Sequence, residues 1–279
     1  MFFDTKTPLA ELDQRYPLVA FDTETSGAYP IDSEIIELGA VKWQNGKVVD
    51  RFSALLKPSR PLTPENIAIH GITNEMVADS PLMDTEIPKF CEFIDGSILV
   101  AHHAPFDLGF VALAVEHARL KLPNTLNLCS SLLSRALLHT TNHKLQTLVK
   151  ELNLVGGEAH RAFDDAYACL QVLFKCFEKL DADADLERLL QIQKKNLFWS
   201  NYLITSLNND KFKYLVKAIQ QQRSINIIYQ GGQTKDNTRP VKPIGIVRNP
   251  DGDYLMAECG LDLQKKRFYI DKIKEVEIF

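Results

Sequence analysis

The sequence lacks the marks of a disulfide-bonded, membrane-spanning or secreted protein. Its 279 residues include five cysteines, an odd number, and these are widely spaced and never form a CxxC pair. That distribution argues against a disulfide framework and against a structural zinc site. The apolar runs are far shorter than the roughly 20 residues of a membrane span, and residues 1–16 contain acids where a signal peptide has a basic start and an apolar run. We therefore expect a soluble, cytoplasmic protein with no membrane contact.

Composition and length predict an ordinary globular protein with two domains. Hydrophobic residues make up 45%, charged residues 24% and aromatic residues 9% of the chain, and the length suits one domain of about 150–200 residues plus a smaller one. The net charge of −4 conceals an asymmetry, since residues 1–204 carry −8 and residues 205–279 carry +4. An acidic half can hold cations and a basic half can attract phosphate, although two solvated surfaces would give the same counts.

The first 180 residues alternate between strand-like and helix-like segments. Strand patterns at 18–21, 35–41 and 48–52, the last two joined by Asn45-Gly46, predict a strand leading into an antiparallel hairpin. Residues 58–81 are rich in Pro, Thr and Asn and predict a loop or lid with a short helix. The remaining expected elements are a helix at 83–95, strands at 97–101 and 126–128, and helices at 106–120, 130–138, 144–152 and 163–180. This alternation predicts a three-layer α/β domain.

The rest of the chain predicts a smaller, separate module. We expect a helical linker over residues 181–206, a helix over 210–222, and short strands at 225–229, 241–247, 253–259 and 267–273. Several short strands in so few residues favour a small β-barrel. The predicted domains are therefore 1–180 and 207–279, joined by the linker at 181–206.

Two acids lie at the end of the first strand. Asp22 and Glu24 are separated by one residue, and positions i and i+2 of a strand point to the same face. The two carboxylates can therefore share a metal, which offsets their mutual repulsion. A strand end with two unrelated, exposed acids would show the same pattern, so more carboxylates are needed to decide.

Further candidate ligands follow a second strand and precede a later helix. Asp107 comes at the start of a predicted helix, where an acid could also simply favour the helix dipole. His160 and Asp165 are five residues apart at the entry to another helix. That spacing lets Asp165 bind a metal while His160 reaches a metal-bound water.

Together these motifs resemble the DEDDh exonucleases, the family of DNA-polymerase proofreading subunits and related nucleases with a ribonuclease-H-like fold. The resemblance covers about residues 16–180 and includes the order and spacing of the motifs. It implies that Asp22, Glu24, Asp107 and Asp165 bind two divalent cations, Mg²⁺ or Mn²⁺, and that His160 acts as the general base. Asp165 is preferred over its neighbour Asp164 because His-x4-Asp is the family's spacing.

The chemistry agrees with what the resemblance implies. Hydrolysis of a phosphodiester requires neutralisation of a developing anion and a hydroxide near neutral pH, and two metals about 3.5–4 Å apart provide both. An imidazole exchanges its proton near neutral pH, which suits it to accept the water's proton.

The resemblance also implies residues that contact the substrate. The candidates are Thr23 and Thr25 beside Glu24, His70 in the segment Ile67–Thr73, His103 and Phe106. A lone loop histidine such as His70 is also often a structural hydrogen-bonding residue. The sequence departs from the family at His103, where asparagine is usual, and at Cys129-Ser130, where an Asp-Thr pair is common.

Residues from about 212 to 279 resemble a WYL domain, an Sm/SH3-like barrel found mainly in bacterial regulators that is thought to bind nucleic-acid or nucleotide ligands. The naming Trp-Tyr-Leu stands here as Asp253-Tyr254-Leu255, and Tyr269 and Lys272 occupy positions where arginines are frequent. The candidate nucleic-acid-binding residues are Arg239, Lys242, Lys265, Lys266 and Arg267, with Tyr229, Tyr254 or Tyr269 available to stack on a base. Core tyrosines and solvated charges would give the same composition.

These features predict a metal-dependent 3′-5′ exonuclease acting on DNA or RNA, with single-stranded 3′ ends as the preferred partner and a C-terminal module that binds nucleic acid. The alternative is a regulator whose WYL domain senses a nucleotide, with the nuclease fold acting mainly as a binding platform. Retention of all five site residues weighs against that alternative.

Overall fold

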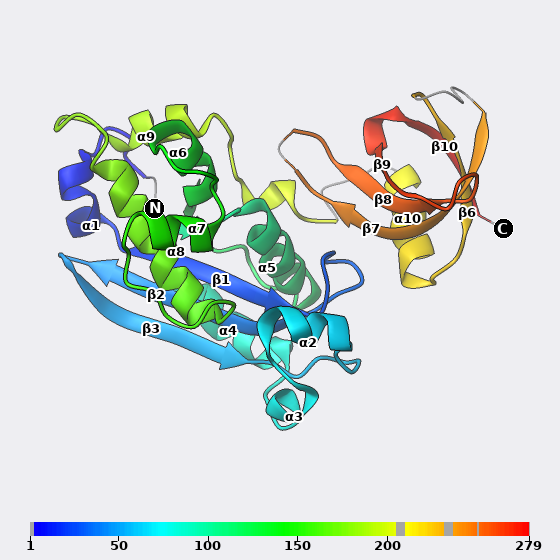
Figure 1. Ribbon diagram of the computed structural model, residues 1–279, viewed down its shortest axis with the longest axis horizontal. Coiled ribbons are helices and arrows are strands. Elements are labelled where there is room, and N and C mark those ends of the chain that lie inside the picture. Colours follow the sequence, from blue (N-terminus) through cyan, green and yellow to red (C-terminus); the bar gives the residue numbers. More distant parts are fainter. Residues whose placement is uncertain (1–2, 205–209, 232–236, 250, 279) are drawn as a thin grey trace. The chain divides into compact units, whose positions relative to one another are not determined.

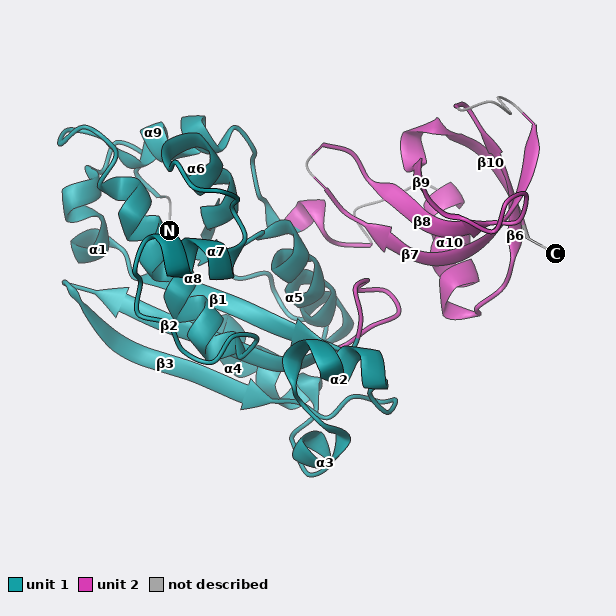
Figure 2. Cartoon of the chain, viewed as in Figure 1, with its two compact units in different colours: residues 1–26, 35–199 teal, residues 27–34, 200–279 magenta. Residues whose placement is uncertain are grey.

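The computed structural model describes residues 3–204, 210–231, 237–249 and 251–278. The chain forms two compact units (Figure 2), one of Met1–Ser26 and Ile35–Trp199 and the other of Gly27–Glu34 and Ser200–Phe279. The second unit therefore includes a short segment from the N-terminal part of the sequence. In the described part of the chain, no helix is long and apolar enough to cross a membrane.

The sheet of the first unit is mixed and has the strand order β3-β2-β1-β4-β5. The antiparallel hairpin is confirmed, and its Asn45-Gly46 turn has positive φ angles of 50° and 76°. Strands β4 and β5 run parallel to β1. The strands are β1 (Leu18–Thr25), β2 (Ile35–Gln44), β3 (Lys47–Leu55), β4 (Ile98–Ala101) and β5 (Leu126–Cys129).

Helices cover both faces of this sheet (Figure 1). On one face, Leu18 and Ala20 of β1 belong to a buried cluster with residues of helix α8 (Ala162–Phe177). On the other face, Phe21 contacts Phe90 of helix α4 (Met83–Ile94), with ring centroids 5.7 Å apart. Alternate residues of β1 therefore face opposite helical layers, as the period of a strand requires. The expected α/β architecture is confirmed.

Further helices complete the first unit. In the predicted lid, Thr63 caps α2 by accepting from the Asn66 N–H, and Gly71 ends the helix with a φ of 70°. The predicted loop therefore contains two short helices, α2 and α3. These further helices are η1 (Leu9–Glu11), α1 (Leu12–Arg15), α2 (Pro64–His70), α3 (Asn74–Val77), α5 (Pro105–His117), α6 (Ser130–Leu137) and α7 (Leu145–Glu151).

The predicted linker over 181–206 is not one continuous helix. Its described residues form α9 (Leu186–Gln193) and the short η2 (Trp199–Asn201). Leu186 and Leu189 are fully buried in the core of the first unit, so α9 packs as part of that unit. The physical reason for this packing is that α9 has an apolar face, which is buried when the helix lies beside α6. The predicted boundary between 206 and 207 lies outside the described residues.

The second unit has an antiparallel sheet in the order β10-β6-β7-β8-β9. Its helix α10 (Asp210–Gln220) buries Phe212, Leu215 and Ile219 in the core of this unit. The predicted strand over 267–273 is interrupted, since the chain passes from β9 through η3 to β10. The elements are β6 (Ile225–Tyr229), β7 (Thr238–Val247), β8 (Tyr254–Cys259), β9 (Lys265–Tyr269), η3 (Ile270–Lys272) and β10 (Ile273–Ile278).

Candidate active site

Strand β1 directs two acids toward α8. Asp22 pairs with Gly39 of β2, and Glu24 pairs with Glu37. Both acids lie in phase with Ala20, whose side chain packs in the cluster that contains α8. The i, i+2 spacing read from the sequence therefore does place the two carboxylates on one face.

Gly39 allows the start of α8 to approach the sheet beside Asp22. A Cβ at position 39 would lie 2.2 Å from the Phe163 nitrogen and 2.3 Å from the Ala162 carbonyl carbon. These are backbone atoms, which cannot move aside as a flexible side chain can. Only glycine permits this close contact between the strand and the first turn of the helix.

Glu37 of β2 holds the same helix start through hydrogen bonds. Its carboxylate is 2% exposed and accepts hydrogen bonds from Arg161 Nη2 at 2.8 Å and Nε at 3.2 Å. Its second oxygen accepts from the Ala162 N–H at 3.0 Å. A bidentate, charge-assisted contact of this kind restricts orientation as well as position. Glu37 therefore holds the residues on either side of the helix entry.

His160 and Asp165 meet across this entry. The His160 N–H donates to Asp165 Oδ2 at 3.1 Å, which the residue achieves with a φ of 62°. Gln146 of α7 donates to the other oxygen, Asp165 Oδ1, at 2.8 Å. Ligand atoms of Glu24, His160 and Asp165 all lie within 4.8 Å of one another, with the histidine exposed and both acids buried. This group could hold a metal ion.

Asp107 reaches the site from the start of α5. It is 2% exposed, and its Oδ1 accepts from both the N–H and the Oγ1 of Thr23, at 3.1 Å and 2.8 Å. The Asp107 carboxylate is thereby bound to Thr23 of β1, the residue between Asp22 and Glu24. Strands β4 and β1 are parallel neighbours, so the chain after β4 emerges at the same sheet edge as the end of β1.

All four carboxylates have raised pKa values, and burial is the largest cause for each. Burial raises the pKa of Glu24 to about 8, and the negative charges of Asp165 and Glu37 add to the effect. Burial also raises the pKa of Asp107 to about 7, against the opposing effect of its hydrogen bonds. Burial, followed by the charges of Asp107 and Glu24, raises the pKa of Asp22, and burial raises that of Asp165. Buried carboxylates crowded in this way favour a bound cation, which would stabilise their charged forms.

The predicted substrate-binding residues lie in different environments. Thr23 is 5% exposed, and its hydroxyl is engaged with Asp107, so its role in the fold is to position that acid. Thr25 is also buried, Phe106 is half-buried against Phe110, and His103 is exposed.

His70 is buried at the end of α2. Its Nδ1 accepts from the Ile72 N–H at 3.0 Å, whereas its Nε2 has no hydrogen-bond partner among the described residues. Burial lowers its pKa, the charge of Glu37 raises it and that of His160 lowers it. Both groups belong to the carboxylate site, so His70 lies within electrostatic reach of that site.

The positions that depart from the family pattern have distinct local environments. His103 has a φ of 66°, in the left-handed region where asparagine and histidine are both enriched among non-glycine residues. Ser130 accepts or donates a hydrogen bond with His102 Nδ1 at 2.8 Å, and His102 Nε2 contacts the His143 carbonyl at 2.9 Å. Burial lowers the pKa of His102 to about 4, which favours a neutral, structural imidazole.

Three residues that support the site were not singled out from the sequence, namely Glu37, Gly39 and Gln146. A sequence signal was available for Glu37. Residues 35–41 form an otherwise apolar strand, so a glutamate within it had to be paired after folding. The contact of Gln146 depends on the packing of α7 beside α8 and had no local signal.

The predicted basic residues of the second unit are not equivalent. Lys242, Lys265 and Arg267 are exposed, and Lys266 forms an ion pair with Asp262. Arg239 is 8% exposed, and its guanidinium lies 5.6 Å from the centroid of the Phe268 ring. Because Arg239 is buried, it differs from the other four residues and is not placed to contact a phosphate at the surface.

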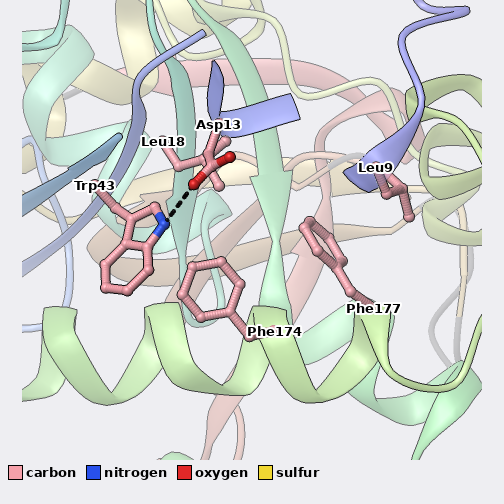
Figure 3. A pocket seen from close by; sticks show the side chains of 6 residues that line it. All are labelled: Leu9, Asp13, Leu18, Trp43, Phe174 and Phe177. Atoms are coloured by element: carbon pink, nitrogen blue, oxygen red, sulfur yellow. Dashed lines mark hydrogen bonds between the residues drawn. The ribbon is translucent and has the colours of Figure 1, made fainter. Parts of the chain in front are cut away.

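An apolar hollow in the first unit is separate from the carboxylates (Figure 3). Trp43 and Phe174 lie in contact along its wall, with ring centroids 5.1 Å apart, and the Trp43 indole N–H donates to Asp13 at 2.9 Å. The hollow is lined by Leu9, Asp13, Leu18, Trp43, Phe174 and Phe177. None of these is a predicted catalytic residue.

Curated proteins similar to the first unit include PolC-type DNA polymerases. The PolC-type DNA polymerase III of Caldanaerobacter subterraneus subsp. tengcongensis is 40% identical over 163 residues, which are 58% of this chain and 12% of that protein. The corresponding polymerase of Listeria innocua is 36% identical over 190 residues, 66% of this chain and 13% of that protein. The chain therefore spans about an eighth of the length of these polymerases. A Mycobacterium tuberculosis protein with the provisional name bifunctional exonuclease/endonuclease MT2247 is 29% identical over 272 residues, 93% of this chain and 38% of that protein.

Solved structures show the same fold. Exonuclease X in complex with 5′-overhanging duplex DNA is 30% identical, with a TM-score of 0.50 over 63% of this chain and 99% of that chain. Exonuclease I is 15% identical, with a TM-score of 0.53 over 94% of this chain and 64% of that chain.

Two family models match the chain. The exonuclease model, RNase T, matches residues 19–173, and the WYL domain model matches residues 210–278. The resemblances recognised in the sequence are thereby confirmed. Since the exonuclease model covers more than half of the chain, from β1 to α8, the chain belongs to this exonuclease family and carries a WYL domain C-terminal to it.

Proposed function

We propose that the protein is a metal-dependent 3′-5′ exonuclease that removes mononucleotides from the 3′ end of DNA or RNA. The observation that carries this proposal is the convergence of four carboxylates from β1, α5 and α8, with raised pKa values for all four. A fold gains no stability from such crowding of like charges. The arrangement is useful where a cation is bound.

The donor set fits hard divalent cations. Carboxylate oxygens are the ligands that Mg²⁺ and Mn²⁺ prefer, and Glu24 and Asp165 already lie within one ligand cluster. Asp22, Glu24, Asp107 and Asp165 would hold two such ions. When bound, they would supply charge neutralisation at the scissile phosphate and an acidified water.

The protein residues have separate tasks in this mechanism. Thr23 holds Asp107, Glu37 holds the entry to α8, and Gln146 orients Asp165. His160 is exposed at that entry, within the same cluster as Glu24 and Asp165, so its imidazole can accept a proton from the attacking water and pass it to solvent. We assign His160 as the general base.

The substrate class is drawn from the relatives. The exonuclease X structure contains 5′-overhanging duplex DNA, and an Escherichia coli exonuclease I structure contains a dA16 oligonucleotide. We propose a single-stranded 3′ end as the preferred substrate here, with His70, His103, Thr25 and Phe106 near the terminal nucleotide.

The second unit is proposed to be an Sm/SH3-like barrel that holds the nucleic acid. Exposed Lys242, Lys265 and Arg267 support phosphate binding. Lys242 and Lys265 are both aligned with Glu258 across β7, β8 and β9, so these strands carry both signs of charge on one face.

A 5′-labelled single-stranded oligonucleotide tests the catalytic proposal. With Mg²⁺ or Mn²⁺, the wild-type protein should produce a ladder of shortened products. The assay is run on a DNA oligonucleotide and on an RNA oligonucleotide of the same sequence. Asp22→Ala and Asp165→Ala should abolish the ladder, and His160→Ala should slow it by about 100-fold or more.

Asp164→Ala provides a matched control for Asp165→Ala. Asp164 is adjacent, accepts from the Glu158 N–H and is not part of the ligand group formed by Glu24, His160 and Asp165, so this variant should retain activity. Absence of a metal-dependent ladder on every substrate would refute the exonuclease proposal. If such a protein still bound nucleotides through its second unit, the regulator alternative would be favoured.

A further inference from the structure

The segment Gly27–Glu34 connects β1 to β2 but packs with the second unit. Ile31 contacts the core of that unit. The Tyr29 side chain lies against β7 at Gly245, where a Cβ would lie 2.2 Å from Tyr29 Cγ and 2.4 Å from Tyr29 Cβ. A glycine inside a strand marks a close approach, and here the group that approaches is an aromatic side chain from a distant part of the sequence.

Gly245, against which Tyr29 lies, is aligned with Met256 of β8 and Arg267 of β9, so Tyr29 lies on the face of the sheet that carries Arg267. Tyr254 of β8 pairs with Tyr269 at the end of β9, and their ring centroids are 6.0 Å apart. The Arg267 guanidinium lies 5.2 Å from the centroid of the Tyr254 ring, and the Lys272 ammonium lies 5.3 Å from that of Tyr269. Burial and the neighbouring Tyr254 raise the pKa of Tyr29, and Arg267 lowers it. We call these five residues the tyrosine cluster.

The cluster lies on the face of the sheet opposite its core. Leu255 and Phe268 are paired across β8 and β9 and are buried, so the residues that alternate with them point outward. Tyr269 is 38% exposed and Arg267 is exposed. The core is thus filled without these rings, and the cluster presents aromatic surface and cations to solvent.

Aromatic rings interleaved with cations are the chemistry that recognises single-stranded nucleic acid. Bases of any sequence stack on aromatic side chains, and neighbouring cations neutralise the phosphates. The cation and ring spacings within the cluster match those of cation–π contacts, which keep the basic groups beside the rings.

We propose that the tyrosine cluster is a stacking surface for single-stranded nucleic acid and that Tyr29 makes the β1–β2 connection part of this surface. This inference rests on the proposed exonuclease function. The chain passes from Glu24 to Tyr29 through the end of β1 and the first residues of the connection. A strand bound at the cluster therefore restrains the segment that follows the catalytic strand, so that retention of a long substrate and its hydrolysis are linked through the chain.

Substitution of Tyr29 tests the inference in the full-length protein. Binding of a 5′-fluorescent oligonucleotide of about 20 nucleotides is measured by anisotropy in a chelator, which prevents hydrolysis. Tyr29→Ala should weaken binding by about tenfold, and Tyr29→Phe should bind like wild type, since the ring is what stacks. Tyr214→Ala is a matched control because Tyr214 is 49% exposed on α10, outside the cluster.

Activity measurements separate retention from chemistry. With a metal ion present, Tyr29→Ala should raise KM for the long oligonucleotide and leave the turnover of a substrate of about four nucleotides unchanged, because stacking adds affinity base by base. Photo-crosslinking of wild-type protein to an oligonucleotide containing iododeoxyuridine should label the peptides that carry Tyr29 or Tyr269.

The outcomes are distinguishable. If wild type degrades long strands but Tyr29→Ala binds them as tightly, or if Tyr214→Ala weakens binding equally, the inference is overturned and the exonuclease proposal stands. Crosslinks confined to peptides outside the cluster also overturn the inference. If wild type degrades no oligonucleotide, the exonuclease proposal fails first, and the inference that rests on it fails too.

Discussion

Chelation of divalent cations combined with a rise in pH should destabilise the folded protein. Burial and mutual repulsion raise the pKa of Glu24 from 4.5 to about 8 and that of Asp107 from 3.8 to about 7. The folded state therefore binds protons more tightly than the unfolded state between these limits, and its stability falls as the pH rises. The loss begins near pH 4, grows through neutral pH and is complete above about pH 8.

The magnitude follows from the pKa difference. For Glu24, ordinary and folded values of 4.5 and about 8 correspond to a free energy on the order of 4–5 kcal/mol. Asp107 experiences part of the same repulsion, so the two contributions are not additive. We expect a total loss of about 5 kcal/mol, which for a chain of this size lowers Tm by about 10 °C.

Thermal denaturation followed by circular dichroism measures this effect at about pH 5 and about pH 8.5 in a chelator. Saturating Mn²⁺ should remove the decline, because the ion displaces protons from the folded carboxylates and binds them. Glu24→Gln should be more stable than wild type at the higher pH in the chelator, and it should be inactive. Glu92→Gln, at an exposed position on α4, should change nothing. A metal-free Tm that stays constant or rises with pH would refute the reasoning.

Three further substitutions test how the site is supported. Gly39→Ala should lower the free energy of unfolding by about 3 kcal/mol in urea denaturation because its Cβ meets backbone, whereas Gly156→Ala, which meets only a side-chain methyl at 3.4 Å, should be tolerated. Glu37→Gln should reduce kcat by about tenfold with little change in KM, since it loosens the helix entry without touching substrate, and an unchanged kcat would contradict this positioning role. Gln193→Ala should cost about 1–3 kcal/mol of stability, because the buried Cys129 N–H loses its acceptor at 2.7 Å, and a neutral effect would argue against α9 as part of the first unit's core.

Local patterns predicted most elements of the first unit correctly. Short-range chemistry and the spacing of apolar residues, which a single sequence displays, determine these elements. Examples are the Asn45-Gly46 turn, the apolar strand that leads to Asp22 and the helix that ends at Phe177. Local patterns did not decide the packing of residues 181–206, which were predicted as a linker. Leu186 and Leu189 form the apolar face of an amphipathic helix. Whether such a face packs on a neighbouring core or lies free between domains depends on tertiary contacts.

The candidate catalytic residues were accessible from the sequence because their order and spacing are strict. The supporting residues were not, because their roles arise between elements far apart in the chain. Glu37 holds Arg161 across 124 positions, and Thr23 holds Asp107 across 84. Arg239 shows the converse, since its charge predicted a surface contact and its burial beside Phe268 was set by the fold of the sheet.

The sequence by itself determined the family, the alternation of strands and helices, and the set of acids with one histidine, because these depend on residue type and spacing. Tertiary structure alone decided how that set is held. It placed Gly39 under the entry to α8, and it brought the carboxylates close enough to raise one another's pKa values. It also assigned Tyr29, which follows the first catalytic strand, to the sheet of the second unit. The physical reason is that burial and long-range contacts exist only once distant segments pack together.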